Sequence, residues 1–252
     1  AISLSAAVII LYSLFFAPAV VEQKDIQNDK NISSENSSTD APSLVQDEET
    51  IKISRNDALK ENERVLFEND KISGSISLIG SSIDDLTFKN YTNTLNGDDN
   101  VILLNPKQSN NGYYVETGWA TTSKNIDLPN SKSQWNIEGN NKLTPNYPVK
   151  LSWTNNQNIK FVKEISLDKQ YLFNIKQTII NNSDKTYNFY PYGQIIRNVA
   201  PDVTNFYILH EGLIGVFDDQ LVEEDYDDIE EKKYSKNAQS GWLDITDKYW
   251  LT

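Results

Sequence analysis

Alternation of apolar and polar residues with a period of two constrains this chain more than any other feature. The run VKLSW at 149–153 alternates, and after the polar turn at 155–158 the run IKFVK at 159–163 alternates again. Successive side chains of a strand point to opposite faces, so this pattern predicts strands with one buried face. Two such runs joined by a short polar turn predict a β-hairpin.

Similar short runs recur along most of the chain. RVLFEN, which starts at Arg64, predicts a first strand, and ISGSISL at 72–78 predicts a strand with one dry and one serine-lined wet face. Further runs lie at 101–104, 113–119, 171–180, 186–192 and 206–209. Because polar turn residues separate these runs and no helical period intervenes, the expected fold class is all-β, a sandwich or barrel. The sequence shows no internal repeat, which argues against a propeller.

The last residues depart from this pattern. Trp242, Ile245 and Tyr249 fall on one face of a helix, which predicts a short C-terminal helix over 240–252. Its aromatic side chains either pack on the sheet or form a belt at a membrane surface, and the residues alone favour packing.

The N-terminal segment 1–21 is almost wholly apolar and as a helix would be about 30 Å long, enough to span a bilayer. The small residues Ala17 and Ala19 around Pro18 also fit a signal peptidase site, so an uncleaved anchor and a cleaved signal peptide both stay open. Residues 22–63 are polar and predict a disordered linker, although the charged stretch 51–64 also suits a short helix.

Charge and cysteine content exclude several function classes. The 252 residues carry a net charge of −13, which repels phosphate backbones and argues against nucleic-acid binding. There is no cysteine, so disulfides, thiol catalysis and cysteine metal sites are excluded.

Nothing in the sequence assembles into a convincing active site. His210 is the one histidine and stands beside Glu211; we expect a structural role rather than acid–base catalysis. The acidic run 218–231 lacks the spacing of a calcium loop and predicts a solvated loop and strand edge. We therefore predict no catalytic, cofactor-binding or metal residue. Five tryptophans suit either the core, which we favour, or a sugar-binding platform: Trp119, Trp135, Trp153, Trp242 and Trp250.

Three segments resemble a known family. GSISLIGSSIDDLTFKNY at 74–91 is similar to the segment that opens the large periplasmic domain of YidC-type membrane protein insertases. ILHEGLIGVFDDQLVEEDYDDIEEKK at 208–233 resembles later strands of that domain, and SGWLDITDKYWLT at 240–252 resembles the helix that leads to the membrane core. The order of an apolar anchor, a polar linker and a β-domain also fits the family.

The resemblance implies a domain plan and a location. Residues 1–21 would be an uncleaved helix in the bacterial inner membrane, residues 22–63 a disordered linker and residues 64–239 a periplasmic β-supersandwich similar to galactose mutarotases. Residues 240–252 would be a helix leading towards the membrane core. The insertase helices of the family are not among the residues shown.

The resemblance also implies a function. The protein would assist insertion, folding and assembly of inner-membrane proteins, alone or with the Sec translocon and its SecDF accessory complex, without a cofactor and without enzyme activity. Two other hypotheses stay open: a secreted carbohydrate-binding or sugar-epimerase-like sandwich with a cleaved signal peptide, and a structural envelope domain. Mutarotase-type epimerases use more than one histidine, whereas this chain has only one.

Overall fold

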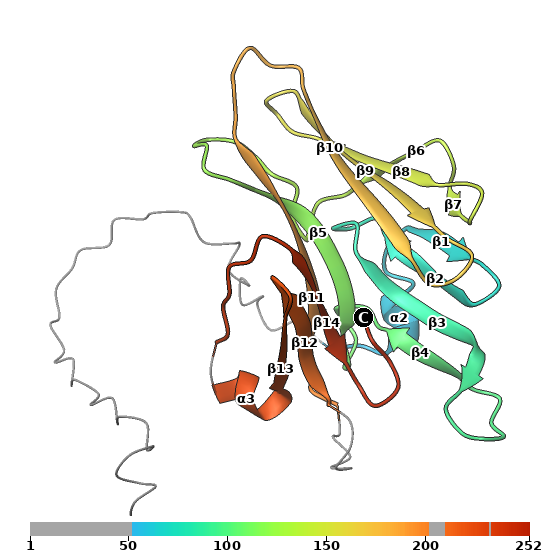
Figure 1. Ribbon diagram of the computed structural model, residues 1–252. Helices are drawn as coiled ribbons and strands as arrows, with labels where there is room; N and C mark the ends of the chain where they lie inside the picture. The colour runs from blue at the N-terminus through green and yellow to red at the C-terminus, as the bar shows by residue number, and fades with distance from the viewer. Residues whose placement is uncertain (1–51, 202–209, 232) are drawn as a thin grey trace, which may run out of the picture. The chain divides into compact units, whose positions relative to one another are not determined.

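A computed structural model of the chain describes residues 52–201, 210–231 and 233–252 (Figure 1). All of them fall within one compact unit. The predicted membrane span 1–21, most of the predicted linker and the predicted strand 206–209 lie outside the described residues. In the described ranges, no helix combines the length and the apolar character that crossing a bilayer requires.

The largest sheet has seven strands, in the order β11-β5-β3-β2-β1-β7, with β4 also paired to β3. All of its pairs are antiparallel except β1 with β7. The strands β5 and β11 run side by side in Figure 1, and their register pairs nine positions of each strand. Its strands are β1 (Arg64–Glu68), β2 (Ile72–Ser77), β3 (Ile83–Thr92), β4 (Asn100–Leu104), β5 (Tyr113–Thr121), β7 (Lys142–Leu143) and β11 (Phe189–Arg197).

The second sheet is antiparallel, in the order β10-β9-β8-β6. The predicted hairpin is confirmed, because β8 and β9 pair with Trp153 opposite Phe161. The side chain of Asn155 closes the turn by accepting the backbone N–H of Gln157 and of Ile159. The strands are β6 (Asn136–Glu138), β8 (Val149–Thr154), β9 (Ile159–Leu167) and β10 (Phe173–Asn181).

These two sheets share one hydrophobic core. Phe161 of β9 is fully buried, and its ring centroid lies 5.1 Å from that of Trp119 in β5 and 5.6 Å from that of Phe189 in β11. At the other end Phe67 of β1 meets Phe173 of β10 edge to face, with centroids 5.0 Å apart. The inward residues of both sheets interdigitate, which confirms the all-β expectation.

The face of β2 that was expected to be wet is buried. Ser75 and Ser77 are 2% and 4% exposed. The Ser75 hydroxyl donates to the carboxylate of Asp85 (2.6 Å) and accepts from Arg64, which also forms an ion pair with Asp84. The alternating serines of β2 therefore belong to a buried polar network and do not form a solvated face.

The described residues include structure on the N-terminal side of the predicted boundary at residue 64. The short helix α2 (Arg55–Ala58) is capped by the Ser54 side chain, and Ala58 is buried. Arg55 forms an ion pair with Asp85 of β3. The expectation of a disordered linker is thus wrong for residues 52–63, because a partner thirty positions further along the chain fixes the helix.

The predicted C-terminal helix is wrong, and with it the boundary at 239/240. Residues 241–246 form β14, which pairs with β12 in a three-stranded sheet of order β13-β12-β14. A Cβ at Gly241 would lie 1.9 Å from the carbonyl oxygen of Val216, so only glycine lets the strands approach. Ile245 is 7% exposed in the shared core, whereas Trp242 and Tyr249 are largely exposed. The helical spacing of Trp242, Ile245 and Tyr249 therefore does not mark a buried face.

The acidic run joins the same sheet. It contains β13 and the short helix α3, so the expected strand is confirmed and the loop is partly helical. Arg197 at the end of β11 links this sheet to the largest one, since its Nη1 bonds both carboxylate oxygens of Asp247 at 2.6 and 2.7 Å. The bounds are β12 (Gly212–Phe217), β13 (Gln220–Asp225), α3 (Tyr226–Glu231) and β14 (Gly241–Thr246).

Candidate functional site

His210 and Glu211 are engaged in structural contacts. The Nδ1 atom of His210 lies 3.0 Å from a carboxylate oxygen of Asp225, and its Nε2 lies 2.9 Å from the carbonyl oxygen of Leu213. Glu211 accepts the backbone N–H of Lys248 at 3.1 Å. The two side chains tie β12 to β13 and to the C-terminal turn. They form no paired acid and base.

Across residues 52–201, 210–231 and 233–252 no group of three or more histidine and carboxylate side chains is placed to hold a metal ion. The acidic run is spread over β13 and α3 and does not converge. That the chain has no catalytic, cofactor-binding or metal residue stays a prediction.

The tryptophans do not form a common platform. Trp119 and Trp135 are 4% and 2% exposed and fill the core between the two larger sheets. Trp153 and Trp250 are partly buried against that core, and Trp242 is 47% exposed on the third sheet. Their dispersal favours the packing interpretation over a sugar-binding surface.

An apolar groove of about 580 Å³ opens between the largest sheet and β10. Its volume lies within the range of small-ligand and peptide-side-chain pockets. We name it the apolar groove, and its walls include Leu86, Phe88, Leu103, Val115, Phe173 and Trp250. Segments from β2, β3, β4, β5 and β10 meet there with the C-terminal residues.

Aromatic rings build one wall of the apolar groove. Trp250 stacks on Phe88 with centroids 4.4 Å apart and an angle of 24° between the rings. Tyr91 meets Trp250 edge to face at 5.0 Å, and Tyr171 meets Phe88 at 5.9 Å. Such contacts position rigid, large apolar surfaces.

The rim of the apolar groove leaves apolar side chains in solvent. Tyr91 is 46% exposed, Tyr171 43%, Leu172 66% and Tyr249 73%. Contiguous exposed apolar surface of this kind marks interaction sites. Sequence reasoning missed the groove, since each contributing run looks like an ordinary strand end and only the fold brings them together.

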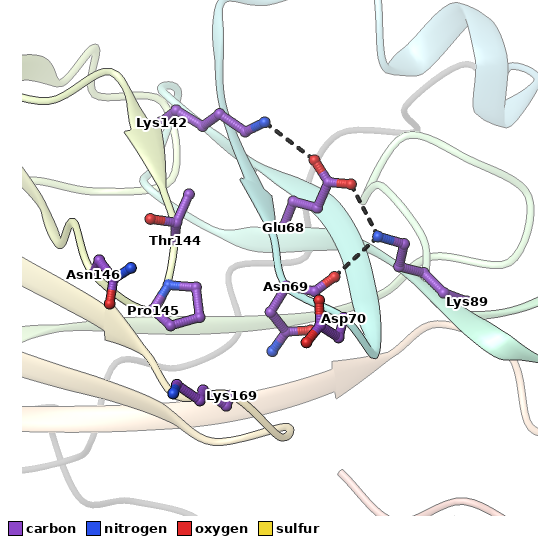
Figure 2. A pocket seen from close by; sticks show the side chains of 9 residues that line it. All are labelled: Glu68, Asn69, Asp70, Lys89, Lys142, Thr144, Pro145, Asn146 and Lys169. Atoms are coloured by element: carbon purple, nitrogen blue, oxygen red, sulfur yellow. Dashed lines mark hydrogen bonds and ion pairs between the residues drawn. The ribbon is translucent and has the colours of Figure 1, made fainter.

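A second, polar pocket of about 410 Å³ lies at the turns β1–β2 and β9–β10, and we name it the lysine pocket. Figure 2 shows Glu68 between Lys89 and Lys142, whose ammonium groups donate to its two carboxylate oxygens at 2.9 and 3.1 Å. These bonds, that of Lys89 first, lower the pKa of Glu68. Lys169 comes from the other turn.

Lys163 is a buried cation in the core that the sequence analysis did not single out. It occupies an inward position of β9, is 1% exposed and donates to the Ser81 hydroxyl and, at 2.6 Å, to the carbonyl of Thr117. Its ammonium lies 4.9 Å from the centre of the Trp135 ring. Burial lowers the pKa of Lys163 to about 7, and the charge of Glu116 opposes the shift.

Stability should therefore depend on Lys163 above neutral pH. With a folded pKa of about 7 and an unfolded pKa near 10.5, the unfolded state binds more protons between these values, so stability rises with pH. We expect the free energy of unfolding of the wild type, relative to that of Lys163→Met, to increase by at most about 3 kcal/mol from pH 7 to 9.5. Urea titrations of both proteins measure this; parallel pH curves would contradict it.

Comparison with known proteins agrees with the earlier resemblance. The family model described as YidC periplasmic domain matches residues 64–252. A membrane protein insertase YidC of Pelagibacter ubique (strain HTCC1062) is 55% identical over 255 residues, which cover all of this chain and 45% of that protein. One of Rickettsia bellii (strain OSU 85-389) is 41% identical over 192 residues, 75% of this chain and 34% of that protein.

The chain spans less than half the length of either relative. The matched residues include all of the strands described above, from β1 to β14. The apolar groove and the lysine pocket are built within the same range. Because the family model matches residues 64–252, which is most of the chain, the chain belongs to the YidC periplasmic domain family.

Proposed function

We propose that the chain is the periplasmic region of a membrane protein insertase, which assists insertion, folding and assembly of inner-membrane proteins. Residues 1–21 would anchor it in the lipid bilayer of the bacterial inner membrane, and the β-sheets would fold as a supersandwich in the periplasm. The insertase names of relatives with 55% and 41% identity support this proposal. The chain would act by binding, without a cofactor or catalysis.

The apolar groove is the observation that carries a mechanism. A client segment that leaves the translocation path exposes apolar side chains, and a groove with aromatic walls can cover them for as long as the segment needs to pack. This task requires reversible contact and no bond chemistry. We propose that the client contacts the rim formed by Tyr91, Tyr171 and Leu172.

The proposed partners follow from the family and not from a recognised surface. We propose contacts with the Sec translocon and the SecDF accessory complex, as well as independent action. Nucleic acid is no partner in this proposal, because the net charge of −13 repels it.

Photo-crosslinking tests the mechanism. A photoreactive phenylalanine analogue replaces Leu172 at the groove rim, and the matched control replaces Leu221, which is 58% exposed on the third sheet. During synthesis of a bacterial inner-membrane protein we expect crosslinks from position 172 and few from 221. Equal yields at both positions would show that the apolar groove does not receive the client.

Removal of Trp250 should weaken binding of an apolar peptide by about tenfold, because a buried aromatic anchor typically contributes more than 1 kcal/mol. Trp250→Ala deletes the ring that stacks on Phe88. Trp242→Ala removes a tryptophan outside the groove and should leave the dissociation constant unchanged. Fluorescence anisotropy of a labelled apolar peptide measures both; equal losses would contradict the assignment.

A further inference from the structure

A third pocket, of about 420 Å³, adjoins the apolar groove, and we name it the amide pocket. Leu103 and Trp250 line both spaces, so these two residues lie at the boundary between them. The two spaces differ in chemistry, because the lining of the amide pocket includes Asn105 and Asn111, whose side chains are amides. A ligand that extends from the apolar groove past Trp250 therefore meets polar groups.

The strand register places Asn105 within reach of a ligand that lies in the apolar groove. Asn105 and Tyr113 are directly opposite each other and are joined by two backbone hydrogen bonds of 2.8 and 3.0 Å. Opposite residues point to the same face of a sheet, and Val115, two positions along β5 from Tyr113, lines the groove. An extended chain rises about 3.3 Å per residue, so a few residues of a peptide bridge the two spaces.

The charged groups of the amide pocket neutralise each other. Both carboxylate oxygens of Asp247 accept from Nη1 of Arg197, at 2.7 and 2.6 Å. The same guanidinium lies over the ring of Tyr113, with its Cζ 4.7 Å from the ring centroid. Because this cation already has a counter-ion, no unpaired positive charge among the described lining residues is available to a phosphate headgroup. A peptide bond is a neutral dipole and needs no counter-charge.

The side-chain amide of Asn105 is available to such a ligand. Among the described residues it forms no hydrogen bond, and the same holds for Asn111. A side-chain amide carries two N–H donors and a carbonyl acceptor, which complement the C=O and N–H groups of a peptide bond. Asn105 is partly buried, so a hydrogen bond to its amide is shielded from water.

We propose that the apolar groove and the amide pocket together bind an extended client segment, with apolar side chains in the groove and a peptide bond on Asn105. This inference rests on the proposed function, because it takes the groove as the client site. An extended segment has unpaired backbone groups, whose burial is unfavourable without a partner. An α-helix has paired its own N–H and C=O groups and gains nothing from Asn105. The two spaces thus select client segments that have not yet folded into helices.

Fluorescence anisotropy of labelled peptides with the full chain tests this selection. A short leucine-rich peptide is compared with the matching depsipeptide, in which esters replace the internal amides. The ester keeps the side chains but has no N–H donors and a weaker carbonyl acceptor. We expect the wild type to bind the depsipeptide about fivefold more weakly than the peptide, which is the effect of about one lost hydrogen bond.

Asn105→Ala separates recognition of the backbone from general apolar binding. It keeps the backbone bonds to Tyr113 and removes only the side-chain amide. The variant should bind the peptide about fivefold more weakly than the wild type does and bind the depsipeptide equally well. A leucine-rich peptide held helical by a hydrocarbon staple should also bind both proteins equally. The matched control is Asn174→Ala, which changes an exposed residue of β10 outside both spaces and should alter none of these affinities.

The possible failures are distinguishable in the same assay. If Asn105→Ala weakens the peptide, the depsipeptide and the stapled helix equally, or weakens none of them, recognition of an extended backbone is overturned and the groove remains the client site. If no peptide binds the wild type, the client site of the proposed function is overturned, and this inference with it. Tighter binding of lysophosphatidylethanolamine than of the peptide would assign the two spaces to a lipid and overturn the inference.

Discussion

Phe161→Ala should destabilise the folded chain by about 3–5 kcal/mol. Phe161 is fully buried, and its ring contacts Trp119, Trp153 and Phe189 with centroids 5.1–5.8 Å away. Removal of the ring leaves a cavity where β5, β8 and β11 meet, and rigid aromatic neighbours fill it poorly. Urea unfolding followed by circular dichroism gives the free energy of unfolding.

The control for this variant is Leu66→Ala. Leu66 precedes a core residue in β1 but is 58% exposed, so its truncation should cost no more than about 0.5 kcal/mol. If both alanine variants lose similar stability, the core between the two larger sheets is not packed as described.

Arg64→Met should cost a similar amount, about 3–5 kcal/mol at pH 8, because it leaves a buried carboxylate without its partner. The side chains of Arg64 and Asp84 are 8% and 4% exposed. Burial already raises the pKa of Asp84 to about 6 against the opposing effect of Arg64. Without Arg64 the pKa rises further, so the loss should shrink at pH 5, where Asp84 is protonated.

A double variant distinguishes the buried charge from simple loss of packing. Arg64→Met with Asp84→Leu removes both charges and should recover most of the stability. Lys142→Met breaks an exposed pair with Glu68 and should leave the free energy of unfolding nearly unchanged, because solvent screens the pair. A pH-independent loss in Arg64→Met, unrelieved by the second substitution, would contradict the ion-pair explanation.

The strands could be predicted from the sequence where one face is dry and the turn is local. The hairpin of β8 and β9 is the clearest case, because its alternation and its Asn155 turn lie within a few residues of each other. The alternation of β2 also predicted a strand correctly. It did not indicate that Ser75 is covered, since the cover comes from Arg64 and Asp85, which lie on other strands.

The failures share a physical cause, which is pairing with a distant segment. Trp242, Ile245 and Tyr249 have helical spacing, yet β12 offers a strand partner that local periodicity cannot reveal. Lys163 shares the inward phase of Ile159 and Phe161, but only the fold shows that its charge is accommodated there, by the carbonyl of Thr117 in another sheet. The apolar groove needs strands β2 to β5, β10 and the C-terminal residues together, so no single run predicts it.

The C-terminal hairpin gives the apolar groove a mechanical property. Thr252 is joined to Ile245 by two backbone hydrogen bonds of 3.0 and 3.1 Å, and Trp250 lies within the loop that they close. Tension applied at Thr252, across the strands, would load these bonds one after the other, as in unzipping, before it reached the longer ladder between β12 and β14. A pull on this end would thus displace the stacked Trp250 before it separated β14 from β12.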